Sequence, residues 1–191
     1  MGIVGRLLTF GGHYVACDMP TSIVIRLADK NDAAAIAAIS RKTFYDTFAA
    51  QNTPGNMQLF MDNVFTEAAL MAEVGAEGNI FLVAVADGDM VGYARLREAP
   101  HPPGLDDAPS IELARIYALQ SMVGKGIGKA LMQQCIDTAR KQGKQVIWLG
   151  VWEHNRHAID FYTKWGFEKF AAHDFVLGND VQKDWLMKKA L

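Results

Sequence analysis

The stretch that decides the fold is Val123-Gly124-Lys125-Gly126-Ile127-Gly128, a glycine-rich turn between an expected strand and an expected helix. Glycines at alternate positions accept positive φ angles and carry no Cβ, so successive backbone N–H groups can converge on one anion. The N-terminus of the following helix adds a partial positive charge. The turn therefore predicts an anion-binding loop, although a turn of this kind can also do no more than begin a helix.

Two common phosphate-binding motifs fail here at particular residues. A Walker loop needs glycine where Val123 stands and serine or threonine where Ala130 stands. A dinucleotide-binding fingerprint needs glycine or alanine where Lys129 stands. The turn therefore belongs to neither class.

The sequence around the turn predicts strands mixed with helices. We expect strands at 23–27, 80–86, 89–98, 111–118 and 146–151, and a final antiparallel pair on either side of 177–180. Helical spacing predicts helices ending near 49, at 55–64, at 67–74, from the turn to about 143, and at 156–164. Asp87-Gly88 favours a type I′ turn, so the strands on either side of it should be antiparallel.

Composition limits the class of protein. The chain has 191 residues, half of them apolar, which suits one globular domain over 22–191. We expect residues 1–21 to form a loosely attached, flexible extension, with a partner-docking arm as the alternative. A net charge of −2 argues against nucleic acid as a partner, and the absence of a long apolar run argues against a membrane-embedded chain. Cys17 and Cys135 are expected to be free thiols in a reducing cytosol, so we expect a cytoplasmic protein.

Two motifs, in order, resemble one family. The glycine turn is similar to the acyl-CoA signature Gln/Arg-x-x-Gly-x-Gly/Ala of the GCN5-related N-acetyltransferases (GNAT), with Gly126 and Gly128 as its glycines and Val123 as its one departure. The segment 155–167 resembles the family's Asn-x-x-Ala-x-x-Phe-Tyr-x-x-x-Gly-Phe. The likeness covers about 23–188. It implies an α/β (α+β) fold: a mixed, mostly antiparallel sheet of about seven strands flanked by helices, with strands four and five splayed.

The resemblance also implies a co-substrate, acetyl-CoA. The pantetheine arm would lie between the splayed strands, pairing with backbone groups of Ile116 and Ala118, and the turn would hold the pyrophosphate. Asn155 would bond the pantetheine, cap the next helix, or do both. The cofactor-binding candidates are Ile116, Tyr117, Ala118, Val123, Gly124, Lys125, Gly126, Ile127, Gly128, Lys129 and Asn155.

Catalysis needs a proton acceptor and a proton donor. An alkylamine with a pKa near ~10 is almost wholly protonated at neutral pH, so the site must remove a proton before the nitrogen can attack. Glu112 and Glu153 lie on the splayed strands, and Glu112 is favoured because family members often carry an acidic base on the fourth strand; either glutamate could instead form a structural ion pair. Tyr162 matches the family's general acid. His154 and His157 lack the spacing of metal ligands, so no metal is expected.

The acceptor is the least determined part. Segments 112–117, 148–155 and 175–182 most resemble PaiA-like spermidine/spermine acetyltransferases, which makes a small-molecule amine the expected acceptor and a polyamine the narrower hypothesis. Residues expected to shape its cleft are Thr43, Phe44, Thr47 and Phe48, with Asp46, Asp62, Glu67, Glu112 and Glu153 as candidates to bind its charge. Acetylation of a protein lysine or N-terminus stays open, as does a non-catalytic acyl-CoA sensor, although the sensor would not need Tyr162. A homodimer is neither favoured nor excluded.

Overall fold

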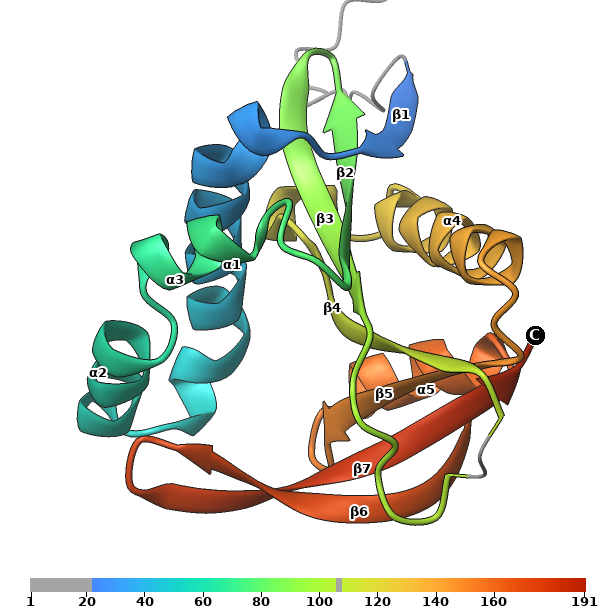
Figure 1. Ribbon diagram of the computed structural model, residues 1–191. Helices are drawn as coiled ribbons and strands as arrows, with labels where there is room; N and C mark the ends of the chain where they lie inside the picture. Colours follow the sequence, from blue (N-terminus) through green and yellow to red (C-terminus); the bar gives the residue numbers. More distant parts are fainter. Residues whose placement is uncertain (1–21, 106–107) are drawn as a thin grey trace, which may run out of the picture.

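The computed structural model describes residues 22–105 and 108–191, and its centre is one seven-stranded sheet in the order β1-β2-β3-β4-β5-β7-β6 (Figure 1). The strands are β1 (Ile23–Leu27), β2 (Asn79–Ala86), β3 (Asp89–Arg97), β4 (Ser110–Ala118), β5 (Val146–Trp152), β6 (Glu168–Leu177) and β7 (Asp180–Ala190). The helices are α1 (Ala33–Phe48), α2 (Pro54–Asn63), α3 (Glu67–Glu73), α4 (Ile127–Lys141) and α5 (Arg156–Lys164). The predicted fold class is confirmed. The extension 1–21 lies outside the described residues.

Local sequence signals explain where several elements begin and turn. Asp87 and Gly88 have φ angles of 52° and 93°, which confirms the predicted turn between antiparallel β2 and β3. Thr66 caps α3 by accepting a hydrogen bond from the Ala69 N–H at 3.1 Å. Thr53 caps α2 in the same way, and Pro54 occupies its first turn, so α2 begins one residue before the predicted start.

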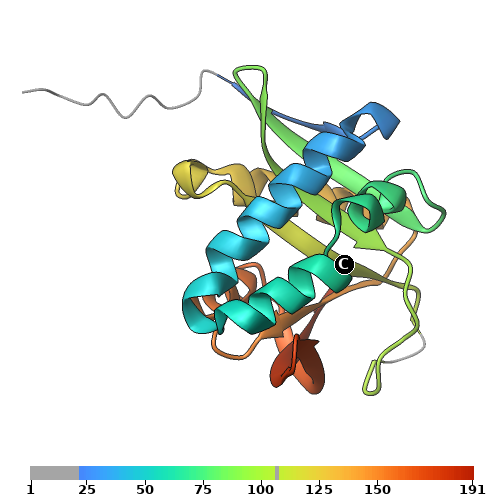
Figure 2. The ribbon, with the colours of Figure 1, turned by 90° about the vertical axis from the view of Figure 1, so that its left-hand side faces the viewer.

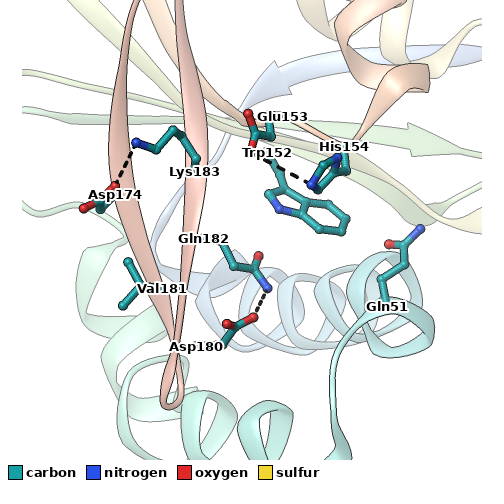
Figure 3. Close-up of a pocket in the computed structure, with 9 residues that line it drawn as sticks. All are labelled: Gln51, Trp152, Glu153, His154, Asp174, Asp180, Val181, Gln182 and Lys183. Carbon is teal, nitrogen blue, oxygen red and sulfur yellow. Dashed lines mark hydrogen bonds and ion pairs between the residues drawn. The ribbon is translucent and has the colours of Figure 1, made fainter.

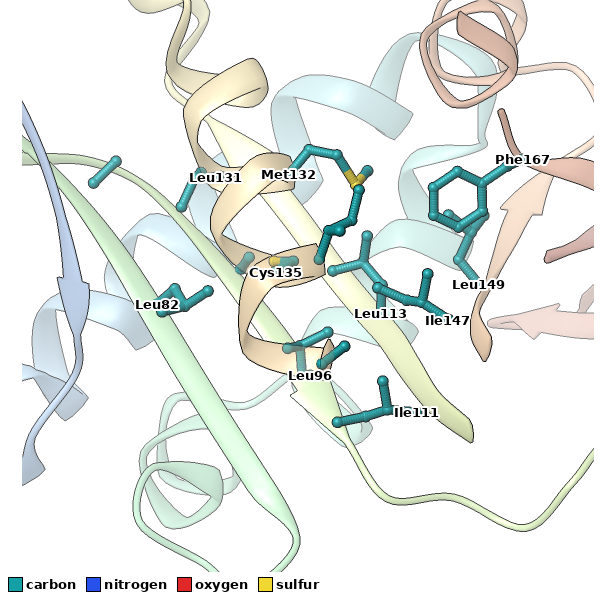
Figure 4. Close-up of a cluster of buried hydrophobic side chains, with 14 of the residues drawn as sticks. Leu82, Leu96, Ile111, Leu113, Leu131, Met132, Cys135, Ile147, Leu149 and Phe167 are labelled. Atoms are coloured by element: carbon teal, nitrogen blue, oxygen red, sulfur yellow. The ribbon is translucent and has the colours of Figure 1, made fainter. Parts of the chain in front are cut away.

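Helices cover both faces of the sheet. The first three helices pack on one face, here called the α1 face, and α4 packs on the other, the α4 face (Figures 1 and 2). Alternate strand residues therefore enter different cores. The α4-face core lies between α4 and the strands β2, β3, β4 and β5. It includes Leu82, Leu96, Leu113, Leu131 and Ile147 (Figure 4). Cys135 lies in the same core as a buried free thiol, as predicted, and burial raises its pKa.

Strands β4 and β5 part after a short contact. They run parallel and pair only from Ser110↔Val146 to Glu112↔Trp148. Beyond that point β5 continues its pairing with β7, while residues 113 and 115–118 of β4 pair only with β3. A bulge leaves Ala114 without a partner on β3 and bends β4 there. The splay expected of strands four and five is thus present, and it leaves an unpaired strand edge open to an extended ligand.

The β6–β7 hairpin is fixed at its tip against α2. Gly178 has a φ of 63°, and a Cβ on it would lie 2.6 Å from the Asn56 Cα, so no other residue fits. The Asn179 N–H donates to Asn56 Oδ1 at 3.0 Å, and Gln182 Nε2 donates to Asn52 Oδ1 at 2.6 Å. These contacts hold the hairpin across the open end of β5.

Candidate active site

The glycine turn presents an uncapped helix N-terminus. Gly124 and Gly126 have φ angles of 83° and 89°, which explains why glycine stands at both. Gly126 is the N-cap of α4, no side chain of the described residues caps that helix, and its first hydrogen bond is Ala130 N–H to Gly126 O at 3.0 Å. The N–H groups of the first turn are therefore placed to bind an anion.

Gly92 of β3, which the sequence analysis did not single out, packs directly against the residues on either side of the glycine turn. A Cβ on Gly92 of β3 would lie 2.8 Å from the Tyr117 carbonyl oxygen and 2.9 Å from Ile127 Cγ2. Glycine at 92 therefore lets the end of β4 and the start of α4 approach β3; an isolated glycine in a strand was the available signal. The Ile127 side chain is buried in the α4-face core, so only its backbone can face a ligand.

The end of β4 lines the splay with one residue on each face in turn. Ile116 and Ala118 pack against the α4-face core. Tyr117 lies on the α1 face, stacked on Tyr93 with ring centroids 6.0 Å apart. Burial raises the pKa of Tyr117, with Tyr93, Tyr162 and Asp184 adding to the rise, so these groups lie within electrostatic reach of its phenol.

Tyr162 lies on α5 beside the splay. Its ring packs between Phe161 and Phe167, at centroid distances of 5.6 and 5.9 Å. Burial, with a smaller effect of the Cys135 thiol, raises the pKa of Tyr162, so the phenol holds its proton at neutral pH. Asn155 caps α5 by accepting a hydrogen bond from the Ala158 N–H at 3.1 Å; its predicted contact with a cofactor remains a prediction.

The two predicted glutamates lie at opposite ends of the splay. Glu112, at the closed end, is buried and accepts two hydrogen bonds from Arg97, at 2.5 and 3.1 Å. This is the structural ion pair that the sequence left open as an alternative. Glu153, just after β5, has a side chain 35% exposed, and its Oε1 lies 3.9 Å from His154 Nε2.

A partly buried charge network that the sequence did not indicate lies on the α1 face. Glu73 of α3 accepts hydrogen bonds from Arg95 at 2.7 Å and from Arg115 at 2.5 Å, and Arg95 also donates to Asn79 at 2.8 Å. It ties α3 to β3 and β4. Truncating Glu73 would leave two arginines underpaired, so the network fixes this wall of the site.

A cavity of about 380 Å³ opens beside the end of β5 (Figure 3). Its lining residues are Gln51, Trp152, Glu153, His154, Asp174, Asp180, Val181, Gln182 and Lys183. A second hollow of about 250 Å³ shares Gln51 and His154 with it. The larger cavity thus lies between the end of α1, the end of β5 and the β6–β7 hairpin, and the smaller hollow lies between the end of α1 and the start of α5.

The structure divides the residues predicted for the acceptor cleft. Glu153 lines the larger cavity, and Thr47 and Phe48 line the smaller one; their part in binding an acceptor remains a prediction. The prediction for Thr43 and Phe44 was wrong: both are buried, because they lie on the side of α1 that packs against the protein interior. The acidic candidates that line neither cavity are Asp46, Asp62, Glu67 and Glu112. Asp174 and Asp180 line the larger cavity. The sequence did not indicate them, because they lie on the β6–β7 hairpin, far from Glu153 along the chain.

Neither a membrane span nor a metal cluster occurs in the part of the chain that the structure describes. Among residues 22–105 and 108–191, no helix is long and apolar enough to cross a membrane. The same residues contain no group of three or more His, Cys, Asp or Glu side chains arranged to hold a metal ion.

With the uncapped glycine turn and the splay in place, comparison with known proteins decides the family. The model of the Acetyltransferase (GNAT) family matches residues 41–167, more than half of the chain. The chain belongs to the GNAT acetyltransferase family. This GNAT protein is 38% identical, over 90% of its length and 99% of the relative's, to an uncharacterized N-acetyltransferase in the pepI 3′ region of Lactobacillus delbrueckii subsp. lactis. A Mycobacterium tuberculosis (strain H37Rv) uncharacterized N-acetyltransferase is 31% identical over 84% of this chain and 98% of its own.

Solved structures agree on the fold. The PaiA N-acetyltransferase of Thermoplasma acidophilum, in complex with coenzyme A, superposes with a TM-score of 0.72 at 23% identity, covering 90% of this chain and 100% of its own. The structure of yncA from Salmonella typhimurium with its cofactor acetyl-CoA superposes with a TM-score of 0.69 at 26% identity, covering 90% of this chain and 95% of its own. The GNAT protein described here is therefore an N-acetyltransferase with acetyl-CoA as its co-substrate.

Proposed function

We propose that this GNAT enzyme acetylates a primary amine of a small molecule, and that the acceptor is a polyamine. The observation that carries the proposal is the acidic cavity at the open end of β5. The Lys183 Nζ lies 3.5 Å from Asp174 Oδ1 and offsets its charge. Among residues 22–105 and 108–191, no lysine or arginine forms an ion pair with the other two cavity carboxylates, Glu153 and Asp180. Two carboxylates beside the splay suit an acceptor with a second ammonium group away from the reacting nitrogen.

The co-substrate is held mainly by backbone in this proposal. N–H groups of Gly126 to Lys129 bind the pyrophosphate at the start of α4. Val123 has no side-chain donor where the family signature has Gln or Arg, so the backbone donors hold the phosphates alone. The pantetheine pairs with the free edge of β4 at Ile116 and Ala118. Asn155 can serve twice, since its Oδ1 caps α5 while its amide N–H groups remain able to donate to a pantetheine carbonyl.

Transfer proceeds by direct attack. The neutral amine nitrogen attacks the thioester carbon, a C–N bond forms, the C–S bond breaks, and Tyr162 donates its proton to the sulfur. The raised pKa of Tyr162 makes a full transfer harder, but the same dry surroundings raise the pKa of the thiol that receives the proton. Of the predicted bases, Glu153 faces the cavity, whereas Glu112 would first have to release Arg97.

A panel of acceptors tests the proposal. Release of free CoA thiol from acetyl-CoA is measured with spermidine, spermine, simple monoamines and a lysine-containing peptide. We expect kcat/KM to be highest for the polyamines. Release with the peptide alone would replace the proposal by protein acetylation. A thermal shift with CoA but no thiol release with any amine would indicate an acyl-CoA sensor.

A further inference from the structure

Asp184 of β7 lies where the splay opens. It pairs with Trp152 of β5 and His173 of β6, and all three positions face α1, as the contact of Trp152 with Phe48 at 6.2 Å shows. In Figure 1, β7 runs directly beside β5 along this part of the sheet.

A glycine on β5, Gly150, leaves room for the Asp184 carboxylate. Gly150 follows Trp148, the last β5 residue paired with β4, by two positions and so faces the same way. A Cβ on Gly150 would lie 3.5 Å from Asp184 Oδ2 and 3.6 Å from His173 Nε2. The carboxylate therefore extends over the bare backbone of Gly150, toward the point where β4 and β5 separate.

One oxygen of this carboxylate is buried without a hydrogen-bond partner in the described part of the chain. Its Oδ1 is fully buried and unpaired, and so is the indole Nε1 of Trp148 nearby on the same face. Burying such groups unpaired costs stability, and each calls for an explanation. A substrate that enters the splay would meet both an unpaired acceptor and an unpaired donor there.

Proton donor and carboxylate lie on opposite sides of the splay. Tyr162 belongs to α5 and packs with the α4-face core, whereas Asp184 is on the α1 face. Both nevertheless lie close enough to Tyr117 to add to the rise in its pKa. The departing sulfur can thus face Tyr162 while the nitrogen arrives from the side of the larger cavity, whose lining includes Trp152, the β5 residue that pairs with Asp184.

We propose that Asp184 is the group that accepts the proton of the attacking amine. The inference rests on the proposed amine acetylation and replaces Glu112 and Glu153 in that one role. The ammonium gives one proton to Asp184, which passes it to solvent, and the freed lone pair forms the C–N bond as the C–S bond breaks. The nitrogen's second proton, lost to solvent, balances the one that restores Tyr162 after it protonates the thiolate.

The surroundings of Asp184 suit this role. Burial raises its pKa to about 6, and His173 opposes that rise. A base titrating near the working pH takes up protons more effectively than an ordinary carboxylate. Tyr117 on β4 is a further titratable group close to Asp184, since Asp184 adds to the rise in the pKa of Tyr117. Glu112 lies at the closed end of the splay, where its two oxygens accept hydrogen bonds from Arg97.

The test compares three carboxylates in one pH profile. Asp184→Asn, Glu112→Gln and Glu153→Gln are assayed by thiol release with the best amine of the panel, from pH 5 to 9. We expect Asp184→Asn to lower kcat/KM about 100-fold at pH 7, to remove the inflection near pH 6, and to leave acetyl-CoA affinity unchanged. Asp89→Asn, the same change at an exposed strand end, should match wild type.

A second variant separates chemistry from structure. Asp184→Ala leaves a gap beside Gly150, and added formate should restore part of its rate but none of the rate of Asp184→Asn. A wild type that acetylates an amine, with Asp184→Asn keeping its rate and pH profile, overturns the role of Asp184 alone. Loss of the inflection in Glu112→Gln or Glu153→Gln, but not in Asp184→Asn, overturns it too. A wild type inactive with every amine overturns the proposed function itself.

Discussion

The two halves of the proposed site, one for the cofactor and one for the acceptor, are built in different ways. The cofactor half consists of the end of β4, the glycine turn and the start of α4, which follow one another in the chain, and it offers mainly backbone groups. The acceptor half gathers side chains from α1, β5 and the β6–β7 hairpin, which are far apart in the sequence. Backbone recognition is local and depends on φ angles. Side-chain recognition depends on how distant segments pack.

The largest expected effect breaks the cofactor half. Gly126→Asp puts a charged side chain at a φ of 89°, into the space meant for the pyrophosphate. We expect acetyl-CoA to bind about 100-fold more weakly, because strain and charge repulsion of roughly 1–2 kcal/mol each add up. Calorimetric titration measures this. Gly143→Asp, at a φ of 70° past the other end of α4, is the matched control and should lose stability but not binding.

Tyr162→Phe acts on chemistry between the two halves. Removing the hydroxyl should lower kcat at least tenfold, because the thiolate leaves without a proton donor, an effect within the range of about 10²–10⁴ for acid–base groups. Acetyl-CoA affinity should change little, since the ring keeps its packing on Phe161 and Phe167. Steady-state and binding measurements separate the two effects. Tyr45→Phe, at an exposed position, serves as control, and wild-type turnover in Tyr162→Phe would rule out the role.

Asp180→Asn tests whether the acceptor half of the proposed site binds a second ammonium group. If this carboxylate holds a remote ammonium, the KM for spermidine should rise about three- to tenfold, the size of one partly exposed ion pair. The KM for a monoamine should stay unchanged, and the difference should shrink at high salt. Asp62→Asn, whose carboxylate lines neither cavity, is the comparison. Equal losses for both amines would show that Asp180 does not read the second charge.

The smallest effect concerns stability and its dependence on pH. Asp184 has a pKa raised to about 6 by burial, so its charged form destabilises the folded protein above that pH, and the penalty vanishes as the pH falls below the unfolded value near ~4. After allowance for solvent screening, we expect Asp184→Asn to raise the free energy of unfolding at pH 8 by about 1 kcal/mol, which corresponds to about 2–4 °C in Tm. The gain should disappear near pH 4. Calorimetry at both pH values checks it, and a loss of stability at pH 8 would contradict it.

Sequence reasoning succeeded where the signal was local. The turn at Asp87-Gly88, the caps and the strand–turn–helix around Gly126 follow from residue conformations and short spacings, and all are present. It was wrong about two residues of α1. Thr43 and Phe44 have the helical spacing of a cleft wall as well as of a core, and only the packing of α1 shows that they are buried.

The sequence by itself determined the order of elements, the glycine turn at the start of α4 and the motif that carries Tyr162, because these depend on φ angles, periodicity and contiguous spacing. Only the tertiary structure decided which carboxylate stands free. Glu112 is neutralised by Arg97 from the neighbouring strand, and Asp184 is left unpaired above Gly150 by the pairing of β7 with β5. Those contacts join residues many positions apart, and no spacing rule reaches across a sheet whose register is set by the whole fold.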